Sequence, residues 1–235
     1  MLGIIGAMDK EVDALRGQMT DAEEKQTGFT RFTVGTLWGE RVCLARCGMG
    51  KVHAALCAQS MIMGFGVSAV LNIGVAGALR SSLDIGDIVV ADSAVQHDAD
   101  ATPIGALPGM VYGLDLVHFP CDPVLSSLLK QAAEEAGLRL ESGAIATGDQ
   151  FIVGTEKKNF LADAFNAAAC DMEGGAIAQC CYEMNVPYAA VRAISDTRDG
   201  DEREFMEKAL FACACEEKLL RRFMALYAGE EKQNG

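Results

Sequence analysis

The sequence has few basic residues for its length. It contains 20 lysines and arginines against 33 aspartates and glutamates in 235 residues, and its formal net charge is -13. A nucleic-acid binder needs a basic surface, so this balance argues against nucleic acid and favours a small molecule as partner. No apolar run reaches the ~20 residues that a membrane-spanning helix needs. Residues 2–8 are apolar but lack a preceding basic region and are followed by Asp9, Lys10 and Glu11, so no export signal is expected.

Cysteine pairs of the C-x-x-C type are also absent. The nine cysteines are odd in number and most lie in apolar runs, where a thiol behaves as a small hydrophobic side chain. They are therefore expected to be core residues of a reduced, cytoplasmic protein. His97, Asp98 and Asp100 lie close together, but with no further histidine nearby they are weak evidence for a metal. We interpret them as loop structure.

Repeats, low-complexity tracts and linkers are missing as well. The chain is therefore expected to form a single domain over residues 1–235. Half of the residues are hydrophobic, which is enough for a sizeable core. The polar segment after Tyr227, residues 228–235, is expected to fray.

Strand-like and helix-like segments alternate along the chain. Short apolar or β-branched runs predict strands at residues 2–7, 30–38, 41–46, 68–73, 87–95, 142–147, 167–170 and 187–195. Helical spacing and composition predict helices at residues 9–19, 50–65, 123–136, 156–166, 173–183 and 203–227. This alternation predicts an α/β fold whose mixed, mostly parallel sheet is flanked by helices on both faces. Residues 97–122 hold three of the five prolines and predict a long irregular loop of the kind that is usually functional.

Acidic residues follow several of the predicted strands. Glu11 comes after the first strand, Glu173 opens a helix after another, and Asp196 follows the last strand. Ligands of open α/β sheets bind beyond the carboxyl ends of the strands. Apolar and aromatic residues alternate with these acids, which suits an uncharged ligand with a flat ring, hydroxyls and an apolar tail. A nucleoside fits this description better than a nucleotide, whose phosphates the carboxylates would repel.

Each acid also has an ordinary structural interpretation. Glu173 can be an acid favoured in the first turn of a helix, and Glu11 can be a solvated first-turn glutamate. Asp196 can cap a turn after its strand. The residues alone leave these alternatives open.

Seven short motifs occur in order along the chain. They are GIIGAM at 3–8 with Glu11, NIGVAG at 72–77, GDIVV at 86–90, HDAD at 97–100, GDQFI at 148–152, DME at 171–173 and VRAISD at 191–196. As a set, the motifs resemble the 5'-methylthioadenosine/S-adenosylhomocysteine nucleosidases of the nucleoside phosphorylase superfamily. The resemblance runs from residue 2 to about residue 225. It implies a nucleoside phosphorylase-like fold.

The resemblance also implies a reaction. This is the irreversible hydrolysis of the N-glycosidic bond of 5'-methylthioadenosine and S-adenosylhomocysteine, which releases adenine and a 5'-thioribose. The reaction would serve methionine salvage and remove a methyltransferase by-product, with no metal or organic cofactor. The implied protein is a cytoplasmic homodimer whose partner is a small nucleoside, and neither nucleic acid nor a membrane.

The family's motifs assign roles to the acids. Asp196 would be the general acid that protonates N7 of the adenine leaving group. A carboxyl can do this only while it is protonated, which burial against Phe151 and Ile152 and neighbouring acids would favour. Glu11 would orient and deprotonate the attacking water, and Glu173 would hold the ribose hydroxyls. These roles correspond to glycoside hydrolysis, in which an acid assists the leaving group and a base activates water.

Further motif residues are assigned to the purine and the water. Phe151 would stack on the purine, and backbone groups of Ile152 would read its edge. Arg192 would fix water and carboxylates. Because a buried arginine needs an acidic partner, its structural alternative is an ion pair with Glu11 or Glu173.

The remaining contacts concern the ribose and the 5' substituent. Met8 and Met172 would pack near the ribose and the sulfur. Ile104 and Pro108 lie on the loop that in this family reaches into the neighbouring subunit, and Phe205 begins the helix that caps the site. These three would form the alkylthio pocket.

Two further positions border the proposed site, and one loop departs from the family. Ser195 directly precedes the acid and is assigned to substrate binding. Val75 is assigned there too, although family members often carry Ser or Thr at this position, so one hydrogen bond near the ribose or the water is expected to be missing. The loop at residues 101–109 is short for the family.

Three rival functions are weighed against this interpretation. A phosphorylase would need a phosphate site, for which Arg46, Arg80 and the turn at residues 48–51 are the candidates. Glu11 would sit where phosphate attacks, which disfavours that rival on charge grounds. A hydrolase of futalosine-type nucleosides would use the same carboxylates and is harder to exclude. A nucleoside-sensing domain without turnover would be expected to lack at least one of Glu11, Glu173 and Asp196.

Overall fold

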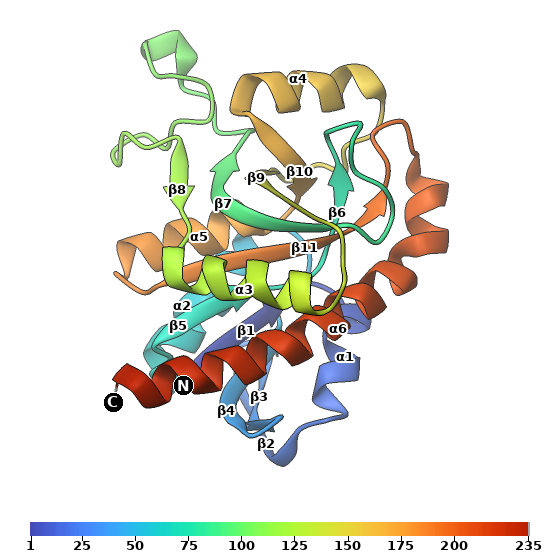
Figure 1. The fold of residues 1–235 in the computed structure, drawn as a ribbon. Helices are drawn as coiled ribbons and strands as arrows, with labels where there is room; N and C mark the ends of the chain where they lie inside the picture. The colour runs from blue at the N-terminus through green and yellow to red at the C-terminus, as the bar shows by residue number, and fades with distance from the viewer. Residues whose placement is uncertain (235) are drawn as a thin grey trace.

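The chain is built on one continuous mixed sheet (Figure 1). The structure, a computed structural model, describes residues 1–234 and the side chains of residues 1–230. The strands are β1 (Leu2–Gly6), β2 (Thr20–Thr27), β3 (Thr30–Leu37), β4 (Glu40–Arg46), β5 (Ala69–Asn72), β6 (Val75–Ala78), β7 (Ile88–Gln96), β8 (His118–Pro120), β9 (Leu140–Thr147), β10 (Ala167–Asp171) and β11 (Tyr188–Asp196). Their order in the sheet is β2-β3-β4-β1-β5-β11-β6-β10-β9-β7-β8.

Part of this sheet closes on itself. Strand β7 pairs with β9 in parallel and also with β11 in antiparallel fashion. Strands β11, β6, β10, β9 and β7 therefore form a closed ring, filled by small and branched side chains such as Ala78, Val89 and Ile194. The strands on the other side of β11, from β5 to β2, continue as an open sheet. The long strand β11 belongs to both parts, since its first residues pair with β5 and its last residues pair with β6.

Helices cover both faces of the sheet. They are α1 (Asp9–Arg16), α2 (Lys51–Phe65), α3 (Pro123–Glu135), α4 (Thr155–Phe165), α5 (Gly174–Glu183) and α6 (Glu202–Asn234), with a short 3-10 helix η1 (Thr102–Ile104). Helices α3 and α6 cover one face, α2 and α5 cover the other, and α4 packs against β10 and β9 (Figure 1). None of the helices in the described chain combines the length and the apolarity needed to cross a membrane.

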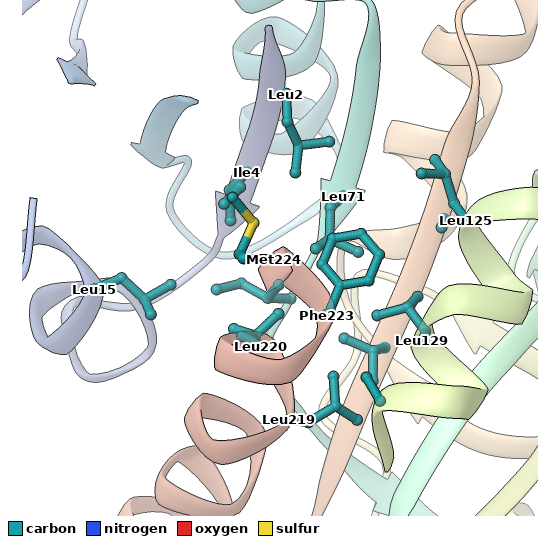
Figure 2. Close-up of a cluster of buried hydrophobic side chains, with 14 of the residues drawn as sticks. Leu2, Ile4, Leu15, Leu71, Leu125, Leu129, Leu219, Leu220, Phe223 and Met224 are labelled. Carbon is teal, nitrogen blue, oxygen red and sulfur yellow. The ribbon is translucent and has the colours of Figure 1, made fainter. Parts of the chain in front are cut away.

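The core beneath α3 and α6 is formed by residues far apart in the sequence. Figure 2 shows Leu219, Leu220 and Phe223 of α6 packed beside Leu129 of α3 and Leu71 of β5. The α6 residues recur at helical spacing, so they form one apolar stripe that faces the sheet. This packing joins α6 to β11, because Val191 and Ala193 of β11 belong to the same cluster.

The fold predicted from the sequence is confirmed as a mixed α/β sheet with helices on both faces, and the differences are local. Strand β2 was not predicted because all of its residues are exposed and most are polar, so the sequence carries no apolar alternation. Strand β6 was not predicted because it is short and contains a glycine. The predicted loop at residues 97–122 contains η1 and β8. Helix α6 continues to Asn234, through most of the segment that was expected to fray.

Candidate active site

The ends of strands β1, β10 and β11 meet beside β6 and enclose a cleft with about 570 Å³ of free space, part of it open to solvent. This is a typical size for a small-molecule site. The lining residues are Ala7, Met8, Glu11, Met49, Val75, Ala76, Gly77, Gln150, Phe151, Ile152, Cys170, Asp171, Met172, Glu173, Ser195, Asp196 and Phe205. The lining contains carboxyl groups and apolar side chains but no lysine, arginine or histidine.

Glu11 is held by backbone amides at the start of α1. Its Oε2 accepts hydrogen bonds from the N–H groups of Ala7 (2.7 Å) and Met8 (2.8 Å). Its Oε1 accepts one from the N–H of Val75 at 3.1 Å. Glutamate at the third helical position commonly bonds back to the helix start in this way. Burial raises the pKa of Glu11, and these hydrogen bonds oppose that shift. A fixed carboxylate with a raised pKa is well suited to accept a proton from water.

Glu173 lies at the start of α5, where the helix dipole favours a negative charge. Its Oε1 accepts a hydrogen bond from the N–H of Gly50 at 2.7 Å. Burial, followed by the nearby charge of Asp171, raises the pKa of Glu173 to about 8. Glu173 can therefore be protonated near neutral pH, and in either state it offers hydrogen-bonding oxygen atoms to the cleft.

Asp196 lies at the carboxyl end of β11 and is 4% exposed. Its Oδ1 accepts a hydrogen bond from the hydroxyl of Ser195 at 3.0 Å, and its Oδ2 accepts one from Nζ of Lys158 at 2.8 Å. Phe151 and Ile152 line the same cleft, as expected. Besides the acids expected near it, Asp196 has a charged neighbour that was not expected, the ammonium of Lys158.

Arg192 does not line the cleft. Its guanidinium is buried behind the cleft, where Nη2 lies 2.6 Å from Oδ2 of Asp171 and Nη1 donates to the carbonyl of Asn72 at 3.0 Å. The acidic partner is therefore Asp171, and neither Glu11 nor Glu173 as the sequence suggested. Their positions explain this, because Asp171 is the last residue of β10 and Glu173 lies two residues beyond it, at the start of α5. Arg192 joins β11 to the ends of β5 and β10.

Apolar side chains form the outer wall of the cleft. Phe151 and Phe205 meet edge to face, with ring centroids 5.3 Å apart. Met8, Ile152 and Met172 line the cleft as expected, and Met49 joins them from the turn before α2. Val75 also lines the cleft, but it contributes a backbone N–H to Glu11 and no hydroxyl.

Ile104 and Pro108 lie away from the cleft of their own chain. Both are exposed on the loop before β8, and neither borders the cleft. In Figure 1 this loop extends from the upper left of the molecule. The structure brings the other predicted site residues, apart from Arg192, together in one cleft.

Three polar residues near the site were not identified from the sequence. Lys158 contacts Asp196, Asp171 holds Arg192, and Glu216 of α6 accepts a hydrogen bond from the N–H of Gly74 at 2.8 Å. Lys158 and Glu216 interrupt the apolar stripes of their helices, and this is the sequence signal that could have revealed them. Asp171 stands in the DME motif but had received no role.

The candidate phosphate-binding groups are occupied by other contacts. Arg46 pairs with Asp9 at 3.2 Å, and Arg80 donates to the carbonyl of Ser142 at 2.9 Å. In the turn before α2, Lys51 pairs through Nζ with Asp98 at 2.6 Å, and Gly50 donates to Glu173. This arrangement leaves no basic group for a phosphate in the lining of the cleft.

Comparison with known proteins gives consistent matches over nearly the whole chain. Residues 1–225 match the family described as the phosphorylase superfamily. The chain is 37% identical over 214 residues to the 5'-methylthioadenosine/S-adenosylhomocysteine nucleosidase of Staphylococcus aureus, which covers 89% of this chain and 93% of that protein.

Solved structures agree with this fold. The nucleosidase of the same name from Neisseria meningitidis, in complex with methylthio-immucillin-A, has a TM-score of 0.90 at 32% identity, covering 95% of this chain and 97% of that one. A futalosine hydrolase from Helicobacter pylori has a TM-score of 0.90 at 34% identity, with the same 95% and 97% coverage.

Proposed function

This chain belongs to the phosphorylase superfamily and, within it, to the 5'-methylthioadenosine/S-adenosylhomocysteine nucleosidases, and from that premise we propose how its cleft acts. The protein is an N-glycosyl hydrolase that cleaves 5'-methylthioadenosine and S-adenosylhomocysteine to adenine and a 5'-thioribose. One observation carries the mechanism. The buried carboxyls of Glu11, Glu173 and Asp196 converge on one apolar cleft that has no basic lining.

The reaction begins at the leaving group. Asp196, with Ser195 and Lys158 against its two oxygens, delivers a proton to N7 of the purine. The bond from C1' to N9 then breaks, and its electron pair stays with adenine. The sugar carries positive charge as this bond breaks, and nearby carboxylates stabilise that charge.

Water completes the reaction on the sugar. Glu11, fixed by three backbone amides, orients a water molecule toward C1' and accepts its proton. Glu173 accepts hydrogen bonds from the ribose hydroxyls. Because Val75 has no hydroxyl, the water is oriented by Glu11 and backbone groups. Phe151 stacks on the purine, Ile152 reads its edge, and Met8 and Met172 pack near the ribose and sulfur.

Arg192 acts from behind the cleft. Through its contacts with Asp171 and Asn72 it fixes the ends of β10 and β5, from which the chain continues to Glu173 and Val75. No metal or organic cofactor enters this mechanism. In the cell the reaction would take place in the cytoplasm, with methionine salvage and removal of a methyltransferase by-product as its purpose.

The proposal includes a homodimer of single-domain chains. Helix α2 exposes Val52 (69%), Leu56 (57%) and Met63 (70%), which recur at helical spacing along one stripe. Beside this stripe, a groove between α2 and α5 is lined by apolar and uncharged residues together with Lys51 and Glu183. Pairing of two chains over this stripe would cover it. Ile104, Pro108 and Phe205 would then form the alkylthio pocket, with the first two supplied by the partner chain.

Light scattering tests the dimer. The wild-type chain is expected at the mass of two chains. Leu56→Glu places a charge in the centre of the stripe and should give a monomer with a raised KM. A monomeric wild-type protein would contradict this part of the proposal.

The activity is tested by following adenine release from 5'-methylthioadenosine and S-adenosylhomocysteine, with and without phosphate. Release at a rate independent of phosphate, with free thioribose as the sugar product, supports the nucleosidase. A phosphate requirement with a sugar 1-phosphate product would make the protein a phosphorylase.

A futalosine-type substrate is the second candidate, because the Helicobacter pylori futalosine hydrolase matches as well as the nucleosidases do. A comparison of kcat/KM for futalosine, 5'-methylthioadenosine and S-adenosylhomocysteine decides between them. The proposal expects futalosine to be the poorest substrate of the three.

A further inference from the structure

A lysine is buried where the helix pattern favours an apolar side chain. Lys158 is fully buried on α4, on the same face as Leu161 and Phe165. Residues at this spacing form the core-facing stripe of a helix. A lysine is almost never fully buried unless it is paired, since the loss of hydration of its ammonium must be offset. The contacts of Lys158 therefore decide what it does.

Those contacts lie at the end of β11. Nζ of Lys158 is 2.8 Å from Oδ2 of Asp196 and 2.7 Å from the carbonyl oxygen of Thr197. In the described chain, two ion pairs have both side chains less than one tenth exposed, Lys158 with Asp196 and Arg192 with Asp171. Arg192 does not give up its proton, and its partner Asp171 has no role in the proposed chemistry. Lys158, by contrast, contacts Asp196, the proposed acid.

Lysine differs from arginine in a way that matters here. A lysine ammonium can give up a proton, whereas an arginine guanidinium cannot. Asp196 contacts the ammonium directly and faces the cleft. The pair therefore contains one group that can release a proton and one that can pass it on.

The hydrogen bonds around Asp196 allow it to change its protonation state. The hydroxyl of Ser195 lies 3.0 Å from Oδ1 of Asp196 and 3.2 Å from the carbonyl oxygen of Ala76. When Asp196 is ionised, this hydroxyl can donate to it. When Asp196 is protonated on Oδ2, the oxygen that Lys158 contacts, Oδ1 can still accept the hydrogen bond from Ser195. No side chain has to move between the two states.

We propose that Lys158 is a positioning residue that supplies the proton which Asp196 passes to the leaving base. An Nζ–H bond breaks as a carboxyl O–H bond forms on Asp196. That O–H bond breaks in turn as the N7–H bond forms, while the electron pair of the C1'–N9 bond moves to the purine. Lys158 is left neutral, and it regains a proton from water before the next turnover. This inference rests on the proposed function.

Other titratable groups surround the pair. They are Cys170 and Asp171 on β10, Glu11 and Glu173 across the cleft, Glu204 of α6 on the hydroxyl of Thr197, and Arg198 and Asp199 beyond the end of β11. The charged group that donates a hydrogen bond to Asp196 is Lys158. The pH dependence is therefore tested by changing Lys158 alone.

The test compares Lys158→Gln, Lys158→Arg and Lys158→Met with the wild-type protein. Gln and Arg can still donate hydrogen bonds to Asp196 and Thr197, but neither gives up its proton. Adenine release from 5'-methylthioadenosine is measured from pH 5 to pH 9. At pH 8 we expect kcat to fall about 100-fold or more in all three variants, with KM changed far less. The alkaline limb of kcat should move to lower pH, because Asp196 must then take its proton from solvent.

The control is a lysine–aspartate pair on the surface. Lys130 of α3 pairs with Asp92 at 3.1 Å, and both side chains are more than one third exposed. Lys130→Met should leave kcat and its pH profile unchanged.

A structural role for Lys158 predicts the opposite pattern. If Lys158→Arg or Lys158→Gln keeps the wild-type kcat and the wild-type alkaline limb, the inference is overturned. Lys158→Gln retains an uncharged hydrogen-bond donor and therefore decides the test even if Lys158→Met does not fold. A wild-type protein that releases no adenine would instead refute the proposed function. An active Asp196→Asn variant would refute the assigned acid.

Discussion

The acid is the side chain whose loss should affect turnover most. Asp196→Asn keeps the shape of the side chain, but an amide cannot deliver a proton to N7. We expect kcat for adenine release to fall by about 10²–10⁴-fold, the usual contribution of a general acid, while binding of the substrate persists. Steady-state kinetics and calorimetric binding measure the two effects. Asp163→Asn, on the exposed side of α4, is the control. Wild-type kcat in Asp196→Asn would remove Asp196 as the acid.

The base should behave differently. Glu11→Gln can accept backbone hydrogen bonds through one oxygen only, so the three amides that hold Glu11 cannot all be satisfied. The variant should bind substrate but stall when water attacks, with kcat lowered by about 100-fold or more. Rapid-quench measurement of sugar product detects the stalled step, and Glu134→Gln on α3 is the exposed control. Unchanged turnover would refute Glu11 as the base.

The sequence identified most lining residues but not the contacts between them. The motif positions of Glu11, Glu173 and Asp196 predicted one cleft, and the structure brings these residues together there. The predicted partner of Arg192 was wrong, because a motif does not show which of two nearby acids, Asp171 or Glu173, bonds to the arginine. Lys158 was not identified because a single charged residue in a helix is ordinarily solvated. Its burial depends on how α4 packs against β10.

The turn between β5 and β6 fixes the position of the base. Gly74 has a φ of +142°, and a Cβ atom added there would lie 2.7 Å from Oε1 of Glu11. Gly74→Ala should therefore displace the carboxylate and lower kcat by about 10-fold or more, since small displacements of a catalytic group are costly. Gly28→Ala is the matched control, because Gly28 also has a positive φ but nothing lies within 4 Å of its added Cβ. Equal kcat in both variants would contradict this role of the turn.

Elements with a clear apolar pattern were predictable, and those held by tertiary contacts were not. Strands β1, β5 and β11 are buried on both faces and read as continuous apolar runs. Strand β2 is fully exposed and exists because it pairs with β3. The closure of the ring through β7 and β11 could not be predicted, since it depends on pairing between strands that lie far apart in the sequence.

The free energy of unfolding of the whole molecule should depend on pH through its buried acids. Burial raises the pKa of Glu216 well above its ordinary value, and Glu11 and Glu173 are raised as well. At a pH above the ordinary glutamate value, the folded protein therefore binds more protons at these sites than the unfolded chain does. The free energy of unfolding consequently falls as pH rises through this range.

Glu216→Gln isolates one of these contributions. The amide oxygen can still accept the hydrogen bond from Gly74, but it does not titrate. Near pH 5 the variant and the wild type should differ little, and the variant should become relatively more stable as pH rises to 8. Urea unfolding at both pH values measures this difference. Glu207→Gln, exposed on the same helix, is the control. A difference in the free energy of unfolding that does not change with pH would contradict the raised pKa of the buried Glu216 carboxyl.

The central claim is that water attacks the sugar in a cleft without a phosphate site. The most direct test is adenine release from 5'-methylthioadenosine in ¹⁸O-labelled water with phosphate present, followed by mass spectrometry of the sugar product. The account predicts methylthioribose that carries one ¹⁸O atom at C1'. An unlabelled methylthioribose 1-phosphate would contradict it.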